Sequence, residues 1–206
     1  MSFAGSLARQ LAHPRGSSGR LLGSAMDVLN RRPMRLALDM LAIRPGEDVL
    51  DAGCGTGAAL AEMRWAGPAS LTGIDRSDVM LNMAHRSLGG TATLIAGDLG
   101  ALPLEDRSMD AALALNILYF DGSDHGFVRE LHRVLRPGGR MVAYVTHRGT
   151  MEGWAFAREG LHRLYDADDL RAALIAGGFA ETEVEVHEVA VTRSVRGLIG
   201  RARRGS

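Results

Sequence analysis

The sequence predicts an α/β fold with a mostly parallel β-sheet, and two stretches carry this prediction. Residues 49–63 read as a buried strand, a turn with alternate glycines and the start of a helix, the order expected of a strand–helix unit. Residues 109–120 contain too few polar residues to alternate, which is typical of a central parallel strand covered on both faces. The 206 residues suffice for one well-buried core and are too few for two ordinary domains.

The glycine turn indicates a small-molecule pocket. Gly53, Gly55 and Gly57 leave no side chains over the turn, so a ligand can lie against bare backbone, and the following helix presents unpaired N–H groups. A dinucleotide fold would space its glycines as G-x-G-x-x-G; this turn lacks that spacing, which disfavours a nicotinamide-dependent oxidoreductase. Asp51 precedes the glycines, and an acid there repels phosphate and suits a ligand that carries an amino group or hydroxyls.

The D-x-G-x-G-x-G turn resembles motif I of the class I S-adenosylmethionine-dependent methyltransferases, whose loop holds the methionine part of the cofactor. The resemblance implies S-adenosylmethionine as the cofactor. It also implies a Rossmann-like, seven-stranded, mostly parallel sheet with helices on both faces and a C-terminal antiparallel hairpin. The residues of the turn that we expect to bind the cofactor are Asp51, Gly53, Cys54, Gly55 and Gly57.

The next strand, residues 71–75, ends in Asp75. This position lies within the ~20-residue distance expected for a carboxylate that accepts both hydroxyls of a ribose. The competing interpretation is that Asp75 caps the helix that starts at once. Ser77 supplies that cap more naturally, which leaves Asp75 free for the ribose. We add the neighbouring Arg76 to the expected cofactor contacts.

Two further strand ends complete the expected cofactor site. Residues 91–96 form a strand of β-branched and apolar residues that Asp98 and Leu99 follow. The resemblance implies that Asp98 accepts from the adenine amino group and that the Leu99 N–H donates to the ring; a turn-forming Asp98 is the alternative. Asn116 is the polar residue at the carboxyl end of the run 109–120, where open α/β sheets bind their ligands. We therefore expect Asn116 near the methyl-bearing sulfur.

We expect residues 1–35 to be a helical lid or lead-in to a methyltransferase domain of residues 36–206. Apolar residues recur at helical spacing near the N-terminus. The absence of acids there superficially suggests a transit peptide, which we disfavour. Two helical patterns follow in residues 21–43, with a break expected near residues 30–33. Asn30 at that break either caps a helix, the favoured interpretation, or contacts the cofactor.

The rest of the chain continues the alternation of helices and strands. We predict a helix over residues 123–135, a strand that runs through residue 145, a helix over 167–176 and a strand over 182–186. The run R-V-L-R-P-G-G-R after the first helix is similar to the family's post-helix signature, and its role is to stop a helix and start a strand. The partner of the last strand is either residues 189–195 or residues 197–203.

Candidate catalytic residues follow from the chemistry that the resemblance implies. Methyl transfer from a sulfonium is an in-line displacement, so the protein mainly has to hold the acceptor in line and exclude water. A general base matters only where the acceptor loses a proton. His147 is our first candidate, because its strand end points at the expected pocket. The other candidates are His162, Tyr119 and His125.

The amino-acid composition limits which binding partners we expect. The 24 basic and 24 acidic residues balance, so attraction to nucleic acid has no global electrostatic basis, and we expect no nucleic-acid partner. No apolar run reaches the ~20 residues of a membrane span. Cys54 is the only cysteine, which excludes an intramolecular disulfide and indicates a reducing, cytoplasmic location. No cluster of His, Cys and Asp has metal-ligand spacing, so we expect no metal.

We expect the acceptor to be a small, partly apolar molecule that is methylated at O, N or C. Its pocket would be built from the N-terminal segment and residues 146–166, which carry Trp154, Phe156 and Tyr165. The alternative function is a catalytically idle protein that binds S-adenosylmethionine or its demethylated product and serves as a partner or regulatory subunit, because binding and catalysis use the same glycine loop. The sequence leaves a homodimer open.

Overall fold

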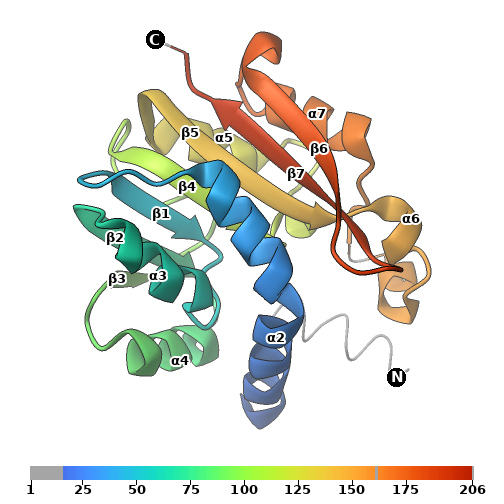
Figure 1. Ribbon diagram of the computed structural model, residues 1–206, viewed down its shortest axis with the longest axis horizontal. Coiled ribbons are helices and arrows are strands. Elements are labelled where there is room, and N and C mark those ends of the chain that lie inside the picture. Colours follow the sequence, from blue (N-terminus) through green and yellow to red (C-terminus); the bar gives the residue numbers. More distant parts are fainter. Residues whose placement is uncertain (1–15, 161, 206) are drawn as a thin grey trace.

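The computed structural model describes residues 16–160 and 162–205 and contains a seven-stranded sheet (Figure 1). The strand order is β3-β2-β1-β4-β5-β7-β6, and the strands run parallel except β7, which pairs antiparallel with β5 and β6. This arrangement confirms the predicted α/β class and the C-terminal antiparallel hairpin. The strands are β1 (Asp48–Ala52), β2 (Ser70–Asp75), β3 (Thr93–Ala96), β4 (Met109–Leu115), β5 (Leu135–Thr146), β6 (Val184–Ala190) and β7 (Arg196–Arg203).

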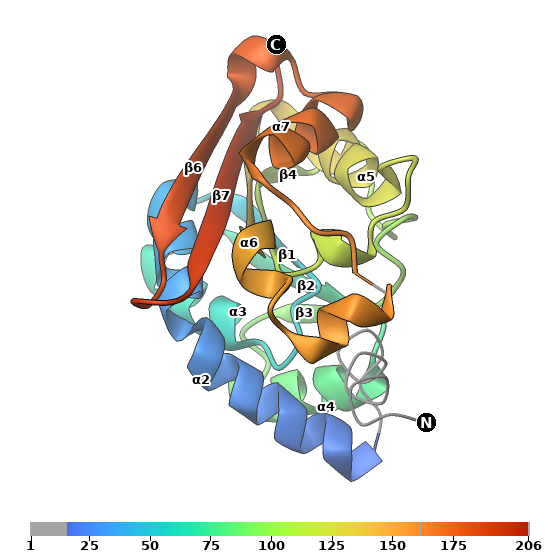
Figure 2. The ribbon, with the colours of Figure 1, turned by 90° about the vertical axis from the view of Figure 1, so that its right-hand side faces the viewer.

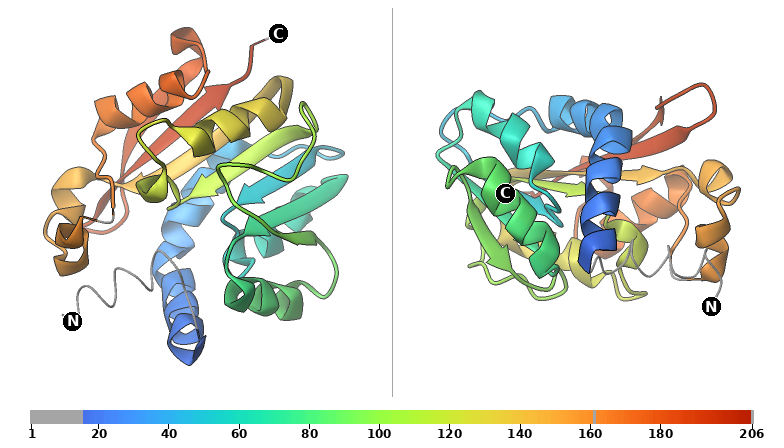
Figure 3. Two further views of the ribbon diagram at one scale, coloured as in Figure 1. Left: turned by 180° about the vertical axis from the view of Figure 1, so that it is seen from behind. Right: turned by 90° about the horizontal axis from the view of Figure 1, so that it is seen from below.

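Helices cover both faces of the sheet, as the fold class predicts. Helices α2, α3 and α4 lie on one face, and α5 and α7 lie on the other, which Figure 3 shows from behind and from below. The α-helices are α2 (Gly16–Leu41), α3 (Ala58–Met63), α4 (Asp78–Leu88), α5 (Gly126–Val134), α6 (Arg148–Met151) and α7 (Ala167–Ala176). Short 3-10 helices are η1 (Arg64–Ala66), η2 (Leu118–Phe120), η3 (Ala155–Glu159) and η4 (Glu181–Glu183).

Strand β4 shows why the run 109–120 lacks polar alternation. Ala111 and Leu113 pack into the apolar cluster on the α2, α3 and α4 face, whereas Ala112 and Ala114 pack into the cluster on the α5 and α7 face. Because successive strand residues point to opposite faces and both faces are covered, the positions after Asp110 are all apolar. The prediction of a central strand is confirmed, but its extent was too long, since β4 ends at Leu115.

The predicted break near residues 30–33 is wrong, because α2 is one continuous helix with Pro33 inside it. Proline removes one backbone hydrogen bond from a helix interior and usually breaks it. Here the turn after Pro33 is held by packing against the sheet, where Met34, Ala37 and Leu41 are buried. The helix therefore runs across the boundary drawn between residues 1–35 and 36–206. The apolar pattern expected before residue 16 lies outside the described residues.

The C-terminal hairpin resolves the two alternatives for the last strand. Strand β7 matches the second alternative, and residues 191–195 form the connection instead of a strand. Figure 2 shows this hairpin at one edge of the sheet, with α6 following the carboxyl end of β5. The helix stop and strand start predicted around residues 133–140 are confirmed, because α5 ends at Val134 and β5 begins at Leu135.

Candidate active site

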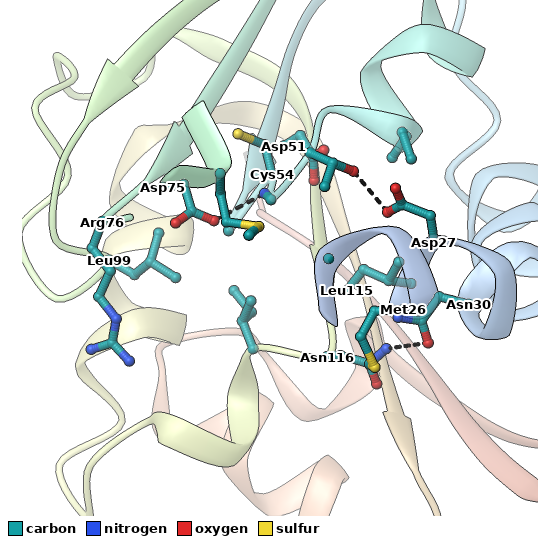
Figure 4. Close-up of a pocket in the computed structure, with 18 of the residues that line it drawn as sticks. Met26, Asp27, Asn30, Asp51, Cys54, Asp75, Arg76, Leu99, Leu115 and Asn116 are labelled. Atoms are coloured by element: carbon teal, nitrogen blue, oxygen red, sulfur yellow. Dashed lines mark hydrogen bonds between the residues drawn. The ribbon is translucent and has the colours of Figure 1, made fainter. Parts of the chain in front are cut away.

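A pocket lies at the carboxyl ends of the parallel strands, which is where open α/β sheets bind ligands. The N-terminal half of α2 projects beyond the sheet and closes one side of it (Figure 1). The other sides are formed by the carboxyl ends of β1, β2 and β4 and by the loop after β3. Predicted cofactor residues that line this pocket are Asp51, Gly53, Cys54, Gly55, Asp75, Arg76, Asp98, Leu99 and Asn116 (Figure 4).

The glycine loop lines the pocket with backbone: a side chain would clash at Gly53, whereas at Gly55 only the backbone conformation favours glycine. Gly53 has φ 73°, and a Cβ there would stand 2.3 Å from Cγ2 of Ile117. Gly55 has φ 52°, so both residues occupy the left-handed region that glycine tolerates best. Gly57 differs from its neighbours: it lies outside the pocket lining, and a Cβ there would stand 2.9 Å from Leu88 of α4. The absence of a side chain at Gly57 permits α4 to pack closely against the start of α3.

Asp75 joins the end of β2 to the glycine loop. Its Oδ2 accepts a 2.9 Å hydrogen bond from the Gly55 N–H, and its Oδ1 accepts a 2.8 Å bond from the Ser77 N–H. Ser77 caps α4, with its side chain accepting from the Met80 N–H, so the predicted cap is confirmed. Burial raises the pKa of the Asp75 carboxyl above its ordinary value. Each carboxylate oxygen retains a second lone pair that a ligand hydroxyl can use.

Asp51 is the most deeply buried acid of the pocket. The residue is 2% exposed, and burial, together with the nearby negative charge of Asp75, raises the pKa of its carboxyl to about 7. A positively charged ligand beside Asp51 would relieve both effects and favour the ionised carboxylate. Cys54 is also buried, and burial raises the pKa of its thiol, so this cysteine lacks the thiolate character that a nucleophile needs.

Asp98 follows β3 and closes a turn, with its Oδ1 accepting a 2.7 Å hydrogen bond from the Gly100 N–H. The structure therefore shows the turn-forming role that was the alternative for Asp98. The residue also lines the pocket with Leu99, so the two roles are compatible. Arg76 reaches the rim of the pocket, where its guanidinium lies 5.9 Å from the ring centroid of Phe120.

Helix α2 supplies pocket residues that the sequence analysis did not assign, among them Met26 and Asp27 (Figure 4). Asp27 Oδ1 accepts a 2.7 Å hydrogen bond from the Thr56 hydroxyl of the glycine loop. Burial raises the pKa of the Asp27 carboxyl. Asn30 lies inside α2, so its interpretation as a helix cap is wrong. Asp27 and Asn30 are three residues apart and share one helix face. This spacing could have indicated that both side chains face the pocket, but the break assumed near residue 30 separated them.

Asn116 sits where the chain leaves β4, in the left-handed conformation with φ 58°. Its side-chain Nδ2 donates a 2.9 Å hydrogen bond to Oδ1 of Asn30. Its Oδ1 accepts a 2.9 Å bond from the hydroxyl of Tyr119, which itself accepts from the Thr146 N–H. Burial raises the pKa of the Tyr119 hydroxyl, so this residue remains a hydrogen-bond donor. The amide of Asn116 is thereby held from both sides.

The histidine candidates lie away from this pocket. His147 caps α6, with Nδ1 accepting a 3.0 Å bond from the Gly149 N–H, and its Nε2 lies 3.7 Å from Glu188 of β6. His162 and Tyr119 line a second pocket, which shares Phe120 with the first. His125 is the N-cap residue of α5, and its Nδ1 lies 4.0 Å from Oδ2 of Asp121. The structure thus brings the predicted cofactor residues together, but it does not bring His147 to them.

Comparison with known proteins identifies the family. The methyltransferase domain family matches residues 49–139 of the chain. The demethylmenaquinone methyltransferase of Tropheryma whipplei (strain Twist) is 32% identical over 195 residues, covering 79% of this chain and 80% of that protein. The chain belongs to the class I S-adenosylmethionine-dependent methyltransferases. This methyltransferase therefore uses S-adenosylmethionine as its cofactor, as the glycine turn predicted.

Other comparisons agree with this family. The malonyl-[acyl-carrier protein] O-methyltransferase of Pseudescherichia vulneris is 32% identical over 170 residues, covering 82% of this chain and 63% of that protein. A solved complex between the Haloferax volcanii Trm112 methyltransferase activator and a methyltransferase has a TM-score of 0.80 at 20% identity, covering 89% of this chain and 93% of that one. The latter likeness supports the fold, and the named relatives differ in the acceptors that they methylate.

The pocket fits the cofactor in its charge. S-adenosylmethionine carries a sulfonium and an ammonium, and the pocket presents carboxylates at Asp51 and Asp75 beside bare glycine backbone. No group of three or more His, Cys, Asp or Glu side chains within residues 16–160 and 162–205 is arranged to hold a metal ion. Over the same residues, none of the helices combines the length and the apolar character needed to cross a membrane.

Proposed function

We propose that this methyltransferase acts on a small, partly apolar acceptor by in-line displacement. The observation that carries the proposal is that the pocket has two kinds of lining. The glycine loop with Asp51 and Asp75 forms the charged part of the lining, and Ile117, which packs against Gly53, forms the apolar part together with Phe120. A charged ligand suits the first part, and an apolar acceptor suits the second.

The pocket residues take the following roles in this proposal. Asp75 accepts from the ribose hydroxyls, while the Asp98 carboxylate and the Leu99 N–H pair with the adenine ring. Asp51 and the glycine loop hold the methionine part through its positive charge. Asn116 lies beside the sulfur, because it follows the end of β4 next to the apolar wall. These roles rest on the position of each group in the pocket and on the family resemblance.

S-adenosylmethionine supplies an activated methyl group when bound, so the protein has little covalent chemistry to perform. The chain orients the acceptor against Ile117 and Phe120 and keeps water from the reacting atoms. Orientation of this kind can contribute ~7–11 kcal/mol to lowering the barrier. Where the acceptor must lose a proton, a general base adds roughly 10²- to 10⁴-fold. Burial raises the pKa of the Tyr119 hydroxyl, which disfavours Tyr119 as this base.

The first acceptor to test is a hydroquinone of the demethylmenaquinone type. The Tropheryma whipplei relative is named for demethylmenaquinone and aligns over most of both chains, and an aromatic, oxygen-bearing ring suits a pocket with polar and apolar lining residues. The relative from Pseudescherichia vulneris is named as an O-methyltransferase of malonyl-[acyl-carrier protein], so this compound is the contrasting candidate, in which a carrier protein holds the acceptor group. The position of the methyl group in the isolated product would identify the nucleophile as carbon or oxygen.

The test is incubation with S-adenosylmethionine labelled in its methyl group and each candidate acceptor, followed by isolation of the product. We expect label in the hydroquinone, with none after substitution of Asp51→Ala. An extract containing small molecules serves as a third acceptor source. Transfer to none of the three, by protein that binds S-adenosylhomocysteine, would overturn the proposal and support a catalytically idle cofactor-binding partner.

A further inference from the structure

Acidic side chains dominate the charged lining of the cofactor pocket. Within the described part of the chain, the lining includes the carboxyl groups of Asp27, Asp51, Asp75 and Asp98 and the guanidinium of Arg76. Asp51, Asp75 and Asp98 lie at the ends of β1, β2 and β3, and each has a place in the proposed function. Asp27 comes instead from α2, and the proposed function gives it no role.

Asp27 is a partly buried carboxylate whose protein contact is neutral. Its Oδ1 accepts a 2.7 Å hydrogen bond from the Thr56 hydroxyl, which satisfies one lone pair and leaves the charge uncompensated. Burial raises the pKa of this carboxyl, and the Thr56 bond offsets only part of that effect. A cationic donor in the pocket would relieve the cost of burying the ionised acid.

Asn30 lines the same pocket one helical turn later, so its side chain shares a face of α2 with Asp27. Its Oδ1 accepts a 2.9 Å hydrogen bond from Nδ2 of Asn116. That bond uses the acceptor of the Asn30 amide and neither of its two N–H donors. Helix α2 therefore presents an anionic acceptor and a neutral donor side by side to the pocket.

The position of this pair matches the amino-acid end of the cofactor. Figure 4 shows Asp27 and Asn30 on the opposite side of the pocket from Arg76 and Leu99. The proposed function assigns the adenine to the side of Leu99 and the ribose to Asp75. Since S-adenosylmethionine carries its adenosine and its amino-acid group at opposite ends, the amino-acid group then extends toward α2.

We propose that α2 recognises the amino-acid group of the cofactor, with Asp27 accepting from the ammonium and the Asn30 amide donating to the carboxylate. The inference rests on the placement of the adenosine in the proposed function and deepens it. A ligand with only a carboxylate would meet the like charge of Asp27, and one with only an ammonium would leave the Asn30 donors unpaired. A zwitterion satisfies both side chains.

The test compares S-adenosylhomocysteine with its deaminated analogue, which keeps the carboxylate and lacks the ammonium. Calorimetry should show the wild type binding the analogue at least ten-fold more weakly, because charge-assisted hydrogen bonds are lost. Asp27→Asn retains an acceptor for the Thr56 hydroxyl and should reduce this preference at least three-fold. The matched control is Asp39→Asn, an exposed acid of the same helix, which should keep the wild-type preference. An unchanged preference in Asp27→Asn would overturn the assignment of Asp27.

A second variant tests Asn30 with the decarboxylated analogue, which keeps the ammonium and lacks the carboxylate. The wild type should bind S-adenosylhomocysteine at least three-fold more tightly than this analogue. Asn30→Asp retains an acceptor for the Asn116 amide but places a negative charge where the donor was, so the order of the two ligands should reverse. A general loosening of α2 affects both ligands and cancels from their ratio. The wild-type order in Asn30→Asp would overturn the assignment of Asn30.

Thr56→Val separates recognition of the ammonium from support of the glycine loop. This variant removes the hydrogen bond to Asp27 and keeps the carboxylate. If Asp27 contacts the ammonium, Thr56→Val should keep the preference for S-adenosylhomocysteine over the deaminated analogue, in contrast to Asp27→Asn. If both variants weaken the two ligands by one common factor, Asp27 supports the loop and the inference is wrong.

The inference and the proposed function can fail separately. If label passes to an acceptor while Asp27→Asn keeps the wild-type preference for the ammonium, the role of α2 is wrong and the proposed function stands. If that preference depends on Asp27 and none of the acceptor sources takes label, α2 recognises the amino-acid group of the cofactor and the proposed function is wrong.

Discussion

The side-chain amide of Asn116 donates a 2.9 Å hydrogen bond to the side-chain oxygen of Asn30, across 86 residues of sequence. This bond ties α2 to the end of the central strand β4. A second bond, from the Thr56 hydroxyl to Asp27, ties the same helix to the glycine loop. Both attachments lie in the pocket, so α2 is fastened over the cofactor site by groups that a bound ligand would approach.

The Asn30–Asn116 hydrogen bond predicts that Asn30→Ala weakens binding of the cofactor product. Loss of one such hydrogen bond costs ~0.5–1.5 kcal/mol, so affinity for S-adenosylhomocysteine should fall about two- to ten-fold as α2 loosens. Isothermal titration calorimetry measures this change. Asn82→Ala is the matched control, because Asn82 is exposed on α4. Equal affinities of the two variants would show that the Asn30–Asn116 bond does not hold the pocket closed.

Substitution of Tyr119 should affect stability and turnover, in contrast to substitution of Asn30. Tyr119→Phe leaves the buried Thr146 N–H without its acceptor, which costs ~1–3 kcal/mol, and it frees the Asn116 amide to rotate. We expect a lower melting temperature and a reduced kcat. The pH dependence of kcat should keep its shape, because the wild-type hydroxyl stays protonated. A shifted pH profile would show that Tyr119 transfers a proton and is more than a positioning residue.

The sequence predicted those parts of the site that are built from short segments. The glycine loop, Asp75 with the Ser77 cap, and the end of the apolar strand at Asn116 each follow directly from a strand end, and parallel strands bring such ends to one edge. Local pattern was sufficient because each of these residues is placed by the element that contains it. The fold class followed from the same alternation.

The contribution of α2 could not be predicted in this way. Pro33 in the sequence indicated a break, whereas packing of Met34, Ala37 and Leu41 on the sheet holds the helix together. The contact of Asn30 with Asn116 depends on that packing and leaves no local pattern. His147 was favoured because it follows β5, yet its side chain turns back to cap α6. Strand ends fix a residue's position and not the direction of its side chain.

The buried acid Asp51 predicts a pH dependence of cofactor binding. Its carboxyl has a pKa of about 7 in the free protein, and a cationic ligand favours the ionised form. Affinity for S-adenosylmethionine should therefore rise by about ten-fold from pH 6 to pH 8. Asp51→Asn removes the titrating group, so the difference between the wild-type and variant profiles isolates it. Parallel profiles would exclude Asp51 from contact with the positive charge.

The carboxyl of Asp51 also predicts that the stability of the free protein falls with rising pH, whereas cofactor affinity rises. Because folding raises the pKa of Asp51 from 3.8 to about 7, the folded protein binds more protons than the unfolded chain between these values. The contribution of Asp51 to the stability of the free protein therefore declines as pH rises through that interval. Asp51→Asn should raise the melting temperature by at least ~2 °C more at pH 8 than at pH 5, since ~1 kcal/mol shifts it by ~2–4 °C. Calorimetric scans that show equal shifts would contradict this.

Asp75 requires a sharper test than simple loss of affinity, because its two oxygens already hold the Gly55 and Ser77 N–H groups. Any substitution loosens that turn as well as removing a ribose contact. The discriminating experiment is a cycle with S-adenosylhomocysteine and its 2′-deoxy analogue on wild type and Asp75→Asn. A hydrogen bond to a charged group contributes ~1.5–3 kcal/mol, so the wild type should bind the analogue roughly 10- to 100-fold more weakly.

In Asp75→Asn the penalty for the missing hydroxyl should shrink, since the neutral amide offers one acceptor where the carboxylate offers two. The turn effect is common to both ligands and cancels from the comparison. Asp78→Asn, an exposed acid in the first turn of α4, serves as the control and should keep the full wild-type penalty. If Asp75→Asn and Asp78→Asn show the same penalty, Asp75 organises the glycine loop and another group receives the ribose.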